Sequence, residues 1–192
     1  METKKTADIE TLLNSKYDNE IENVILLDSN CETYVFELKD GESSGLYSAK
    51  LSKIILEPGL YFHFKYHEDW RLISYENYRH NYLDWIDLNG ELILYRGEII
   101  KVFSHGFYLV DHVSDNFSKT MELKNRYIYF YSSYYEKDDN EPKSYFLISN
   151  IEDAVEDENG HYLLILKKEF LTKEVGVFDL KNSKWIHEMK KV

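Results

Sequence analysis

Hydrophobic and polar positions alternate in short segments along most of the chain after residue 21. The segments are rich in β-branched and aromatic residues, and this combination is typical of β-strands. We therefore predict strands at Val24–Asp28, Thr33–Lys39, Leu60–Tyr66, Trp70–Tyr75, Tyr82–Asp87, Glu91–Tyr95, Glu98–Phe103, Gly106–His112, Arg126–Ser132, Ser144–Ser149, His161–Lys167 and Val175–Leu180.

Helical spacing of apolar residues is clear only near the N-terminus. Ile9, Leu12 and Leu13 recur at helical intervals within 7–15, and Thr6 or Asp8 is a suitable N-cap. The pattern predicts a helical segment within 1–20 and a β-repeat body over 21–192, together forming one domain.

Glycine dipeptides separate the predicted strands. Asp40-Gly41, Asn89-Gly90 and Asn159-Gly160 favour tight hairpins because glycine accepts a positive φ, and Pro58-Gly59 also favours a turn. Residues 136–143 hold little that could be buried and indicate a loop. Short strands without intervening helices predict an all-β antiparallel fold, propeller-like or sandwich-like, with one short N-terminal helix.

Residues 85–110 read WIDLNGELILYRGEIIKVFSHGFYLV. This stretch resembles a WG-repeat unit, in which an aromatic residue and Asp precede a glycine turn and a hydrophobic strand, followed by Phe, Gly and a valine-rich strand. Ile86 departs from the pattern, because glycine is usual after the aromatic residue. Trp85, Asp87, Gly90, Ile93, Phe103, Gly106 and Val110 occupy the matching positions. The resemblance implies a β-repeat meander and carries no catalytic motif.

A partial second copy spans residues 160–186, and the segment ending at Asp40-Gly41 is a weaker echo. Glu37, Asp87 and Asp179 would occupy equivalent positions in successive repeats. Their separations are 50 and 92 residues, and 92 is twice 46. A repeat of this size is typical of a four-stranded propeller blade, and the missing copy would lie near residue 132.

The chain has 192 residues, with 23 Lys and Arg against 35 Asp and Glu, a net charge of −12. Its 17 Tyr, 10 Phe and 3 Trp are enough for a core and exclude disorder. The negative charge disfavours direct binding of nucleic acid through phosphates. The sequence shows neither a signal-peptide pattern nor an apolar stretch of membrane-spanning length, so we expect a cytoplasmic protein without membrane contact. The lone Cys31 fits a reducing compartment.

Candidate catalytic or metal-binding residues do not form a known motif. His63 and His67 are four apart in a predicted strand, a spacing of about 13 Å that prevents them from sharing a metal unless a bulge intervenes. Phe62 and Phe64 are expected to pack inward beside them. Ser104 and Cys31 lack the context of a nucleophile. We therefore expect no enzyme, metal site or cofactor. The alternative is a β-fold enzyme or a small-ligand or carbohydrate-binding protein, with a pocket built from His63, His67, His105, Asp111 and His112.

Charge and tyrosine are concentrated together in one part of the sequence. Residues 136–158 hold nine acids against two lysines, a net −7, whereas 167–192 hold seven lysines against four acids, a net +3. A tyrosine-rich strand precedes the acidic stretch, and its tyrosines are displayed if Ile128 and Phe130 face the core. The predicted partner-binding residues are Tyr127, Tyr129, Tyr131, Tyr134, Tyr135, Glu136, Asp138, Asp139, Glu141, Glu152, Asp153, Glu156, Asp157 and Glu158.

Tyrosines supply contact area at interfaces and acids steer a basic partner towards them. The sequence therefore predicts a non-enzymatic protein-binding module, an acidic inhibitor that covers a basic surface of a partner, such as a nucleic-acid-binding protein. Immunity proteins and anti-defence proteins of bacteria or phages, anti-CRISPR proteins among them, are similar in type: small, acidic and without catalytic motifs.

Overall fold

The computed structural model describes residues 2–79, 82–113, 124–130, 145–169 and 171–192. The chain forms two compact units, Met1–Tyr95 (unit 1) and Arg96–Val192 (unit 2). The division neither confirms nor contradicts a single domain over 1–192, and that expectation stays a prediction.

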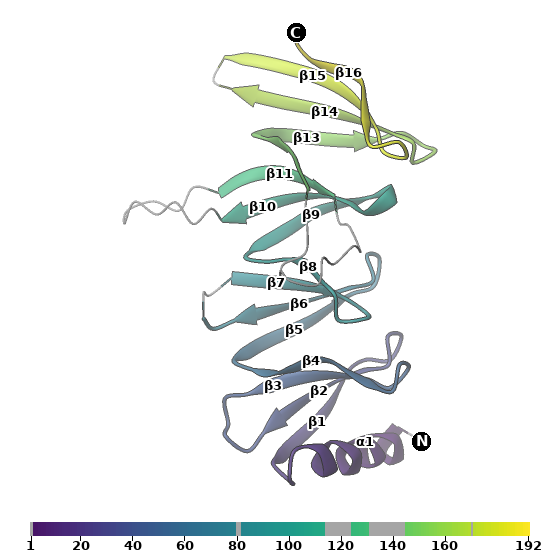
Figure 1. The fold of residues 1–192 in the computed structure, drawn as a ribbon, viewed down its shortest axis with the longest axis vertical. Coiled ribbons are helices and arrows are strands. Elements are labelled where there is room, and N and C mark those ends of the chain that lie inside the picture. Colours follow the sequence, from purple (N-terminus) through teal and green to yellow (C-terminus); the bar gives the residue numbers. More distant parts are fainter. Residues whose placement is uncertain (1, 80–81, 114–123, 131–144, 170) are drawn as a thin grey trace. The chain divides into compact units, whose positions relative to one another are not determined.

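Sixteen described strands form four antiparallel sheets, each with four strands that are consecutive along the chain (Figure 1). This confirms the all-β fold with a short N-terminal helix. A four-stranded meander is the strand order of a propeller blade. Among the described residues, no helix is both long and apolar enough to cross a membrane.

Unit 1 begins with helix α1 (Glu2–Lys16), followed by two sheets. Sheet I contains β1 (Ile21–Asp28), β2 (Thr33–Leu38), β3 (Ser44–Ser48) and β4 (Lys53–Gly59). Sheet II contains β5 (Tyr61–His67), β6 (Leu72–Asn77), β7 (Tyr82–Asp87) and β8 (Leu92–Leu94).

Two apolar layers hold unit 1 together. In the first, Ile9 and Leu13 of α1 pack on sheet I, where Ile21, Tyr34 and Phe36 are buried. The second layer joins sheets I and II and includes Leu46, Ile55, Ile73, Tyr75 and Ile86. Sheet I thus lies between α1 and sheet II, with apolar side chains on both of its faces.

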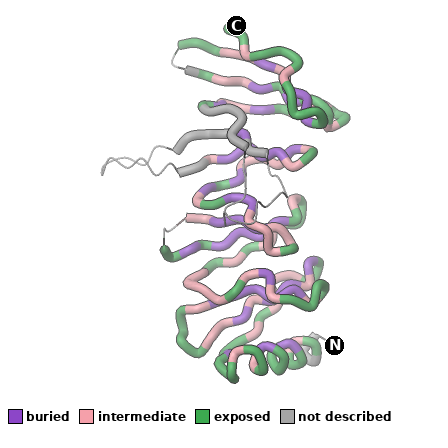
Figure 2. Tube along the Cα trace, viewed as in Figure 1, coloured by how far each residue is buried: buried purple, intermediate pink, exposed green. Residues whose placement is uncertain are grey.

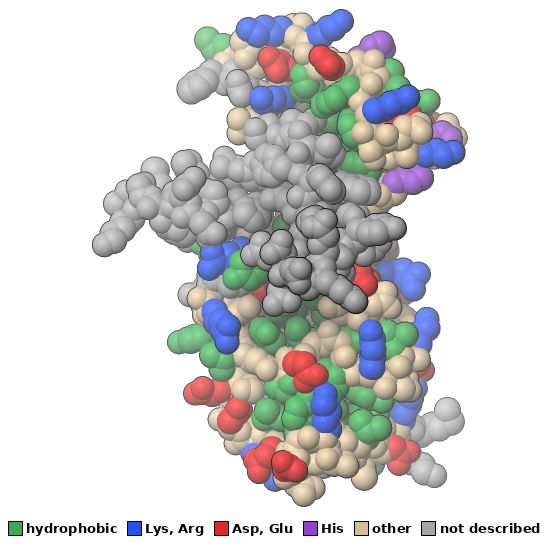
Figure 3. Space-filling model, in the orientation of Figure 1, with side chains coloured by type: hydrophobic (Ala, Val, Ile, Leu, Met, Phe, Trp, Pro, Cys, Tyr) green, Lys and Arg blue, Asp and Glu red, His purple; other side chains and the backbone are tan. Residues whose placement is uncertain are grey.

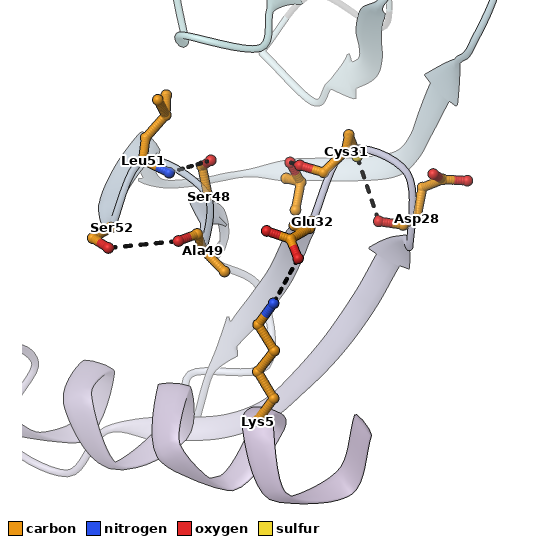
Figure 4. Close-up of polar contacts among 9 residues, drawn as sticks. Lys5, Asp28, Cys31, Glu32, Ser48, Ala49, Leu51 and Ser52 are labelled. Atoms are coloured by element: carbon orange, nitrogen blue, oxygen red, sulfur yellow. Dashed lines mark hydrogen bonds and ion pairs between the residues drawn. The ribbon is translucent and has the colours of Figure 1, made fainter. Parts of the chain in front are cut away.

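Polar contacts fix both ends of α1 to sheet I. Lys5 Nζ lies 2.8 Å from Glu32 Oε1 beside the β1–β2 turn (Figure 4). Lys16 Nζ lies 3.0 Å from Glu57 Oε1, and the Tyr17 hydroxyl donates to Glu57 Oε2 at 2.6 Å. The Tyr17 hydrogen bond, followed by Lys16, lowers the pKa of Glu57. Cys31, in the same turn as Glu32, is buried, and its Sγ lies 3.6 Å from the Asp28 carbonyl oxygen.

Unit 2 contains the remaining two sheets. Sheet III contains β9 (Gly97–Phe103), β10 (Phe107–Val113), β11 (Lys124–Phe130) and β12 (Tyr145–Ser149), with a 3-10 turn η1 (Ser104–Gly106) between β9 and β10. Sheet IV contains β13 (Ile151–Glu156), β14 (Tyr162–Glu169), β15 (Thr172–Asp179) and β16 (Lys184–Lys191).

One apolar core joins the two sheets of unit 2. Phe103, Phe107, Leu109 and Ile128 come from sheet III or its edges, and they share this core with buried residues of sheet IV. The sheet IV members are Ile151, Ala154, Leu163, Ile165 and Phe178, together with Leu180 just after β15. Figure 2 shows buried and exposed positions interspersed along the strands of sheet IV, as strand alternation requires.

Four observed strands were not expected from the sequence. β3 has two serines and a glycine among its five residues, and Gly45 packs so closely that a Cβ there would lie 2.5 Å from the Phe36 ring. Pro58 and Gly59, expected to form a turn, are the last two residues of β4. β13 and β16 are rich in charged residues, and their pairing with β14 and β15 defines them as strands. The predicted glycine turns are confirmed, with a positive φ at Gly41, Gly90 and Gly160.

The expected repeat phase is correct in part. Asp87 and Asp179 both end the third strand of a sheet, and each accepts a hydrogen bond from an N–H in the following turn, from Asn89 and Asn182 respectively. Glu37, by contrast, lies in the second strand of sheet I. The missing copy was expected near residue 132, which lies after β11, the third strand of sheet III, and outside the described part of the chain.

Candidate protein-binding site

Two acids of β13, Glu152 and Asp153, form ion pairs within unit 2. Lys101 Nζ of β9 lies 2.6 Å from Asp153 Oδ1 and also donates to the Ala154 carbonyl oxygen at 3.1 Å. Lys168 Nζ lies 3.6 Å from Glu152 Oε1. Each lysine offsets the charge of its neighbouring carboxylate, so Asp153 and Glu152 contribute less to a long-range field than their formal charges suggest.

Two further acids organise turns. Glu156 Oε1 accepts a hydrogen bond of 2.9 Å from the backbone N–H of Ser104 in η1. Asp157 Oδ1 accepts from the backbone N–H groups of His161 at 2.7 Å and Tyr162 at 2.6 Å. The hydrogen bond from Tyr162 is the main cause that lowers the pKa of Asp157. Among the described acids of this stretch, Glu158 is exposed at the tip of the β13–β14 hairpin.

The rest of the predicted partner-binding set is less fully described. Tyr127 and Tyr129 lie in β11, opposite Val110 and Tyr108 of β10. Ile128 between them is buried, which is one of the two conditions for the tyrosines to be exposed. The displayed tyrosine row stays a prediction. The residues that lie outside the described part of the chain are Tyr131, Tyr134, Tyr135, Glu136, Asp138, Asp139 and Glu141.

The histidines considered for a pocket have separate environments. His63 is exposed, and its Nδ1 lies 3.0 Å from Glu76 Oε2. His67 stacks on Trp70 with ring centroids 5.5 Å apart, contacts Trp85 at 4.6 Å and lies 2.9 Å from Ser74 Oγ through its Nε2. Burial, followed by the charge of Lys65, lowers the pKa of His67.

The other pocket candidates lie in unit 2. His105 is exposed in η1, Asp111 is partly buried in β10, and the side chain of His112 lies outside the described part of the chain. Within the described residues, no group of three or more His, Cys, Asp and Glu side chains is arranged to hold a metal ion.

An exposed aromatic pair on sheet II was not expected. Phe62 of β5 and Tyr78 after β6 pack edge to face with ring centroids 6.2 Å apart. The two side chains are 37% and 66% exposed. The inward orientation expected for Phe62 is therefore wrong, although Phe64 does pack against the core. A β-bulge explains the difference, because pairing of β5 with β6 shifts between Phe62 and Lys65, and His63 has a φ of 50°.

Side chains of β5 and β6, next to this aromatic pair in the chain, are packed and hydrogen-bonded. Tyr75 of β6 contacts Tyr61 at 5.0 Å and Phe64 at 5.8 Å between ring centroids. At the end of β6, Asn77 donates to the buried Asp84 Oδ2 at 3.0 Å and its side-chain oxygen accepts from the Arg79 N–H at 3.1 Å. Asn77 immediately precedes Tyr78, so these hydrogen bonds position the backbone that carries the exposed Tyr78 ring.

Charge is distributed unequally between the units. Residues 1–95 contain 9 Lys and Arg against 18 Asp and Glu, a net −9. Residues 96–192 contain 14 against 17, a net −3. The acidic stretch 136–158 is therefore largely balanced by lysines elsewhere in unit 2, and the exposed aromatic pair belongs to the more acidic unit. Figure 3 shows hydrophobic, acidic and basic side chains interspersed on the visible face of unit 1.

Comparisons with known proteins give no family. No protein-family model matches the chain. No curated protein matches it at a significant level.

Solved structures resemble the chain only distantly. A eukaryotic initiation factor matches with a TM-score of 0.38 and 14% identity over 90% of this chain and 44% of its own. Hydrazine synthase of Kuenenia stuttgartiensis matches with a TM-score of 0.35 and 11% identity over 84% of this chain and 46% of its own. A Bacteroides fragilis protein described as a candidate 6-phosphogluconolactonase matches with a TM-score of 0.33 and 9% identity over 90% and 54%. The chain thus spans about half the length of these structures.

Proposed function

We propose that the protein is a non-enzymatic protein-binding module, an acidic inhibitor of the immunity or anti-defence type that covers a basic surface of a partner. The observation that carries the proposal is the exposed Phe62–Tyr78 pair on a unit with a net charge of −9. Aromatic side chains held in place on a protein surface are typical anchors of interfaces.

The net negative charge of unit 1 indicates that the partner surface is basic. A net negative unit attracts a basic surface over roughly a Debye length, which raises the rate of association at low salt. A basic surface is common on nucleic-acid-binding proteins, so these are the partner class we favour. The Tyr127–Glu158 region would add a second contact, through Tyr127, Tyr129 and the exposed Glu158.

Other parts of the proposal rest on the sequence. The all-β meander and the match at residues 85–110 support kinship with WG-repeat proteins. A cytoplasmic location is part of the proposal, because the single cysteine fits a reducing compartment. Neither point bears on which protein is bound.

Affinity capture from a host lysate tests the proposal. Immobilised wild-type protein is compared with the Phe62→Ser/Tyr78→Ser double variant at about 50 and 300 mM NaCl, salt levels that differ strongly in screening. We expect a basic protein to be retained at low salt, released at high salt and lost in the double variant. Ile25→Ser is the matched control, because Ile25 is 53% exposed elsewhere in unit 1.

Three results would contradict the proposal. One is retention of the same proteins by the double variant, and another is binding that is insensitive to salt. The third is that the captured proteins are acidic. Circular dichroism of each variant checks that the sheets are intact before the comparison is made.

A further inference from the structure

Sheet IV has an apolar row on the face that points away from the core of unit 2. Val155, Leu164 and Val177 are directly opposite one another in β13, β14 and β15. Residues directly opposite in a sheet share a face, whereas Ala154 and Ile165 beside them are buried on the other face. Val155 is 55% exposed and Leu164 is 48% exposed.

Neighbouring positions extend the apolar surface. Leu166 lies opposite Val175, and both are partly buried. Tyr162, 45% exposed, occupies the next position of β14 on this face, two residues before Leu164. The surface therefore crosses three strands, and we call it the sheet IV face.

Basic side chains border the sheet IV face. His187, Lys190 and Lys184 of β16 lie opposite Val177, Val175 and Asp179 of β15. All three are exposed, as is Lys173 of β15, which lies opposite Lys168 of β14. This border contrasts with the net charge of −12 of the chain. In Figure 3, hydrophobic, lysine and histidine side chains lie close together in the C-terminal part of the chain.

The chain itself contains an example of how such a face is covered. On sheet I, the face that points away from sheet II is covered by α1 through Ile9 and Leu13. There the helix carries the basic groups Lys5 and Lys16, and the partners Glu32 and Glu57 on the sheet side are acidic. On sheet IV the basic groups belong to the sheet, so a complementary helix must be acidic.

We propose that the sheet IV face binds an amphipathic helix of a partner protein whose apolar stripe is flanked by acidic residues. The apolar row receives the stripe, and Lys184, Lys190 and Lys173 receive the carboxylates. Pairing of opposite charges at the border specifies the partner more than it adds affinity, because the lysines are exposed. This interaction is independent of the proposed basic partner of unit 1 and differs from it in surface and in charge.

A pair of peptides tests the inference. One has the sequence of residues 2–16, and the other carries Lys4→Glu, Lys5→Glu and Lys16→Glu in the same sequence. Both are terminally capped and stapled between the positions of Thr11 and Ser15, which are exposed in α1, because short isolated helices are marginal in water. Fluorescence anisotropy with the full chain should give at least about tenfold tighter binding for the acidic peptide, or 1.4 kcal/mol.

Variants assign the binding to the sheet IV face. Leu164→Ser should weaken binding of the acidic peptide about tenfold, and Lys184→Glu/Lys190→Glu should reverse its preference over the native-sequence peptide. Ile25→Ser and Lys50→Glu/Lys53→Glu are matched exposed controls in unit 1 and should leave binding unchanged.

The inference is overturned if both peptides bind equally or if Leu164→Ser has no effect. It is also overturned if the face serves another occupant. One such result is binding to vesicles of 3:1 phosphatidylcholine and phosphatidylserine without binding of either peptide. The other is a dimer that light scattering detects and that Leu164→Ser abolishes. Loss of binding by the Phe62→Ser/Tyr78→Ser variant of the proposed function would place the peptide on unit 1 and would overturn it as well.

Discussion

The carboxylate of Glu156 accepts a hydrogen bond of 2.9 Å from the backbone N–H of Ser104, 52 residues earlier in the chain. This contact joins η1 of sheet III to the end of β13 in sheet IV. A carboxylate predicted to face a partner thus links two sheets of unit 2.

Replacement of Glu156 by Ala should destabilise unit 2 by about 1.5–3 kcal/mol, the usual contribution of a hydrogen bond to a charged group. Glu156→Gln keeps an oxygen acceptor and should cost clearly less. Urea unfolding measures both, followed by the fluorescence of Trp185 in a background in which Trp70 and Trp85 of unit 1 are replaced by Phe. Equal stability of the Ala variant and the wild type would show that the contact contributes nothing.

Gly160 should tolerate alanine worse than Gly41 does. Both have a positive φ, +67° and +72°, where alanine is strained by about 1–2 kcal/mol. A Cβ at Gly41 would meet nothing within 4 Å, whereas at Gly160 it would lie 2.6 Å from Ser104 Oγ. Gly160→Ala should therefore lose about 1 kcal/mol more than Gly41→Ala in chemical denaturation.

A second substitution separates backbone strain from the steric contact. Ser104→Gly removes the hydroxyl that the new methyl group would meet. In a double-mutant cycle it should reduce the excess cost of Gly160→Ala to the cost seen at Gly41. An additive cycle would assign the whole effect to the backbone.

Asp157 should make the stability of unit 2 depend on pH in the acid range. Its three hydrogen bonds from backbone N–H groups lower its pKa below the ordinary 3.8, with the bond from Tyr162 the largest cause. A lowered pKa means that the folded state favours the carboxylate, so the stabilisation is full above about pH 4–5 and is lost as pH falls through the folded pKa.

The comparison with Asp157→Ala measures this contribution. The difference in melting temperature between wild type and variant should be largest near neutral pH and should shrink below pH 3.8. Glu158→Ala is the control, since Glu158 is the exposed neighbour in the same hairpin. A difference that is constant from pH 2.5 to 7 would contradict the expectation.

His67 should report its protonation through tryptophan fluorescence. It stacks on Trp70 and contacts Trp85, and a protonated imidazole quenches indole emission. Because burial and Lys65 lower the pKa of His67, the midpoint should lie below the ordinary 6.5. The folded state favours the neutral ring, so stability from this site is full above pH 6.5 and decreases as pH falls.

A fluorescence titration between pH 4 and 8 measures the midpoint. His67→Gln should abolish the transition, whereas His63→Gln should not, because His63 is exposed beside Glu76. A midpoint above 6.5, or a transition that persists in His67→Gln, would show that another group is responsible.

Local sequence patterns were sufficient to predict those elements whose backbone conformation is determined by a residue and its near neighbours. Alternation predicted β7 at its observed bounds, and the helical spacing of Ile9, Leu12 and Leu13 predicted a helix at α1. Ile9 and Leu13 are buried in that helix, whereas Leu12 is exposed. The glycines of Asn89-Gly90 and Asn159-Gly160 adopt a positive φ because other residues rarely do. The strands β13 and β16 were not predicted, because their charged residues obscure the alternation. Their strand conformation depends on pairing with β14 and β15.

The candidate sites depended on contacts that no local pattern contains. The roles of Asp153 and Glu156 require Lys101 and Ser104, about fifty residues away in sequence. Phe62 is exposed because a bulge at His63 breaks the alternation on which its predicted burial relied. The sheet IV face exists because register aligns Val155, Leu164 and Val177 across three strands.

The sequence by itself thus determined most of the strands, the glycine turns and the all-β class, because backbone sterics and side-chain alternation act over a few residues. Only the tertiary structure decided which carboxylates are used within the fold and which apolar side chains remain exposed. Those outcomes depend on strand register and sheet packing, which bring distant residues together and turn each side chain towards the core or towards solvent.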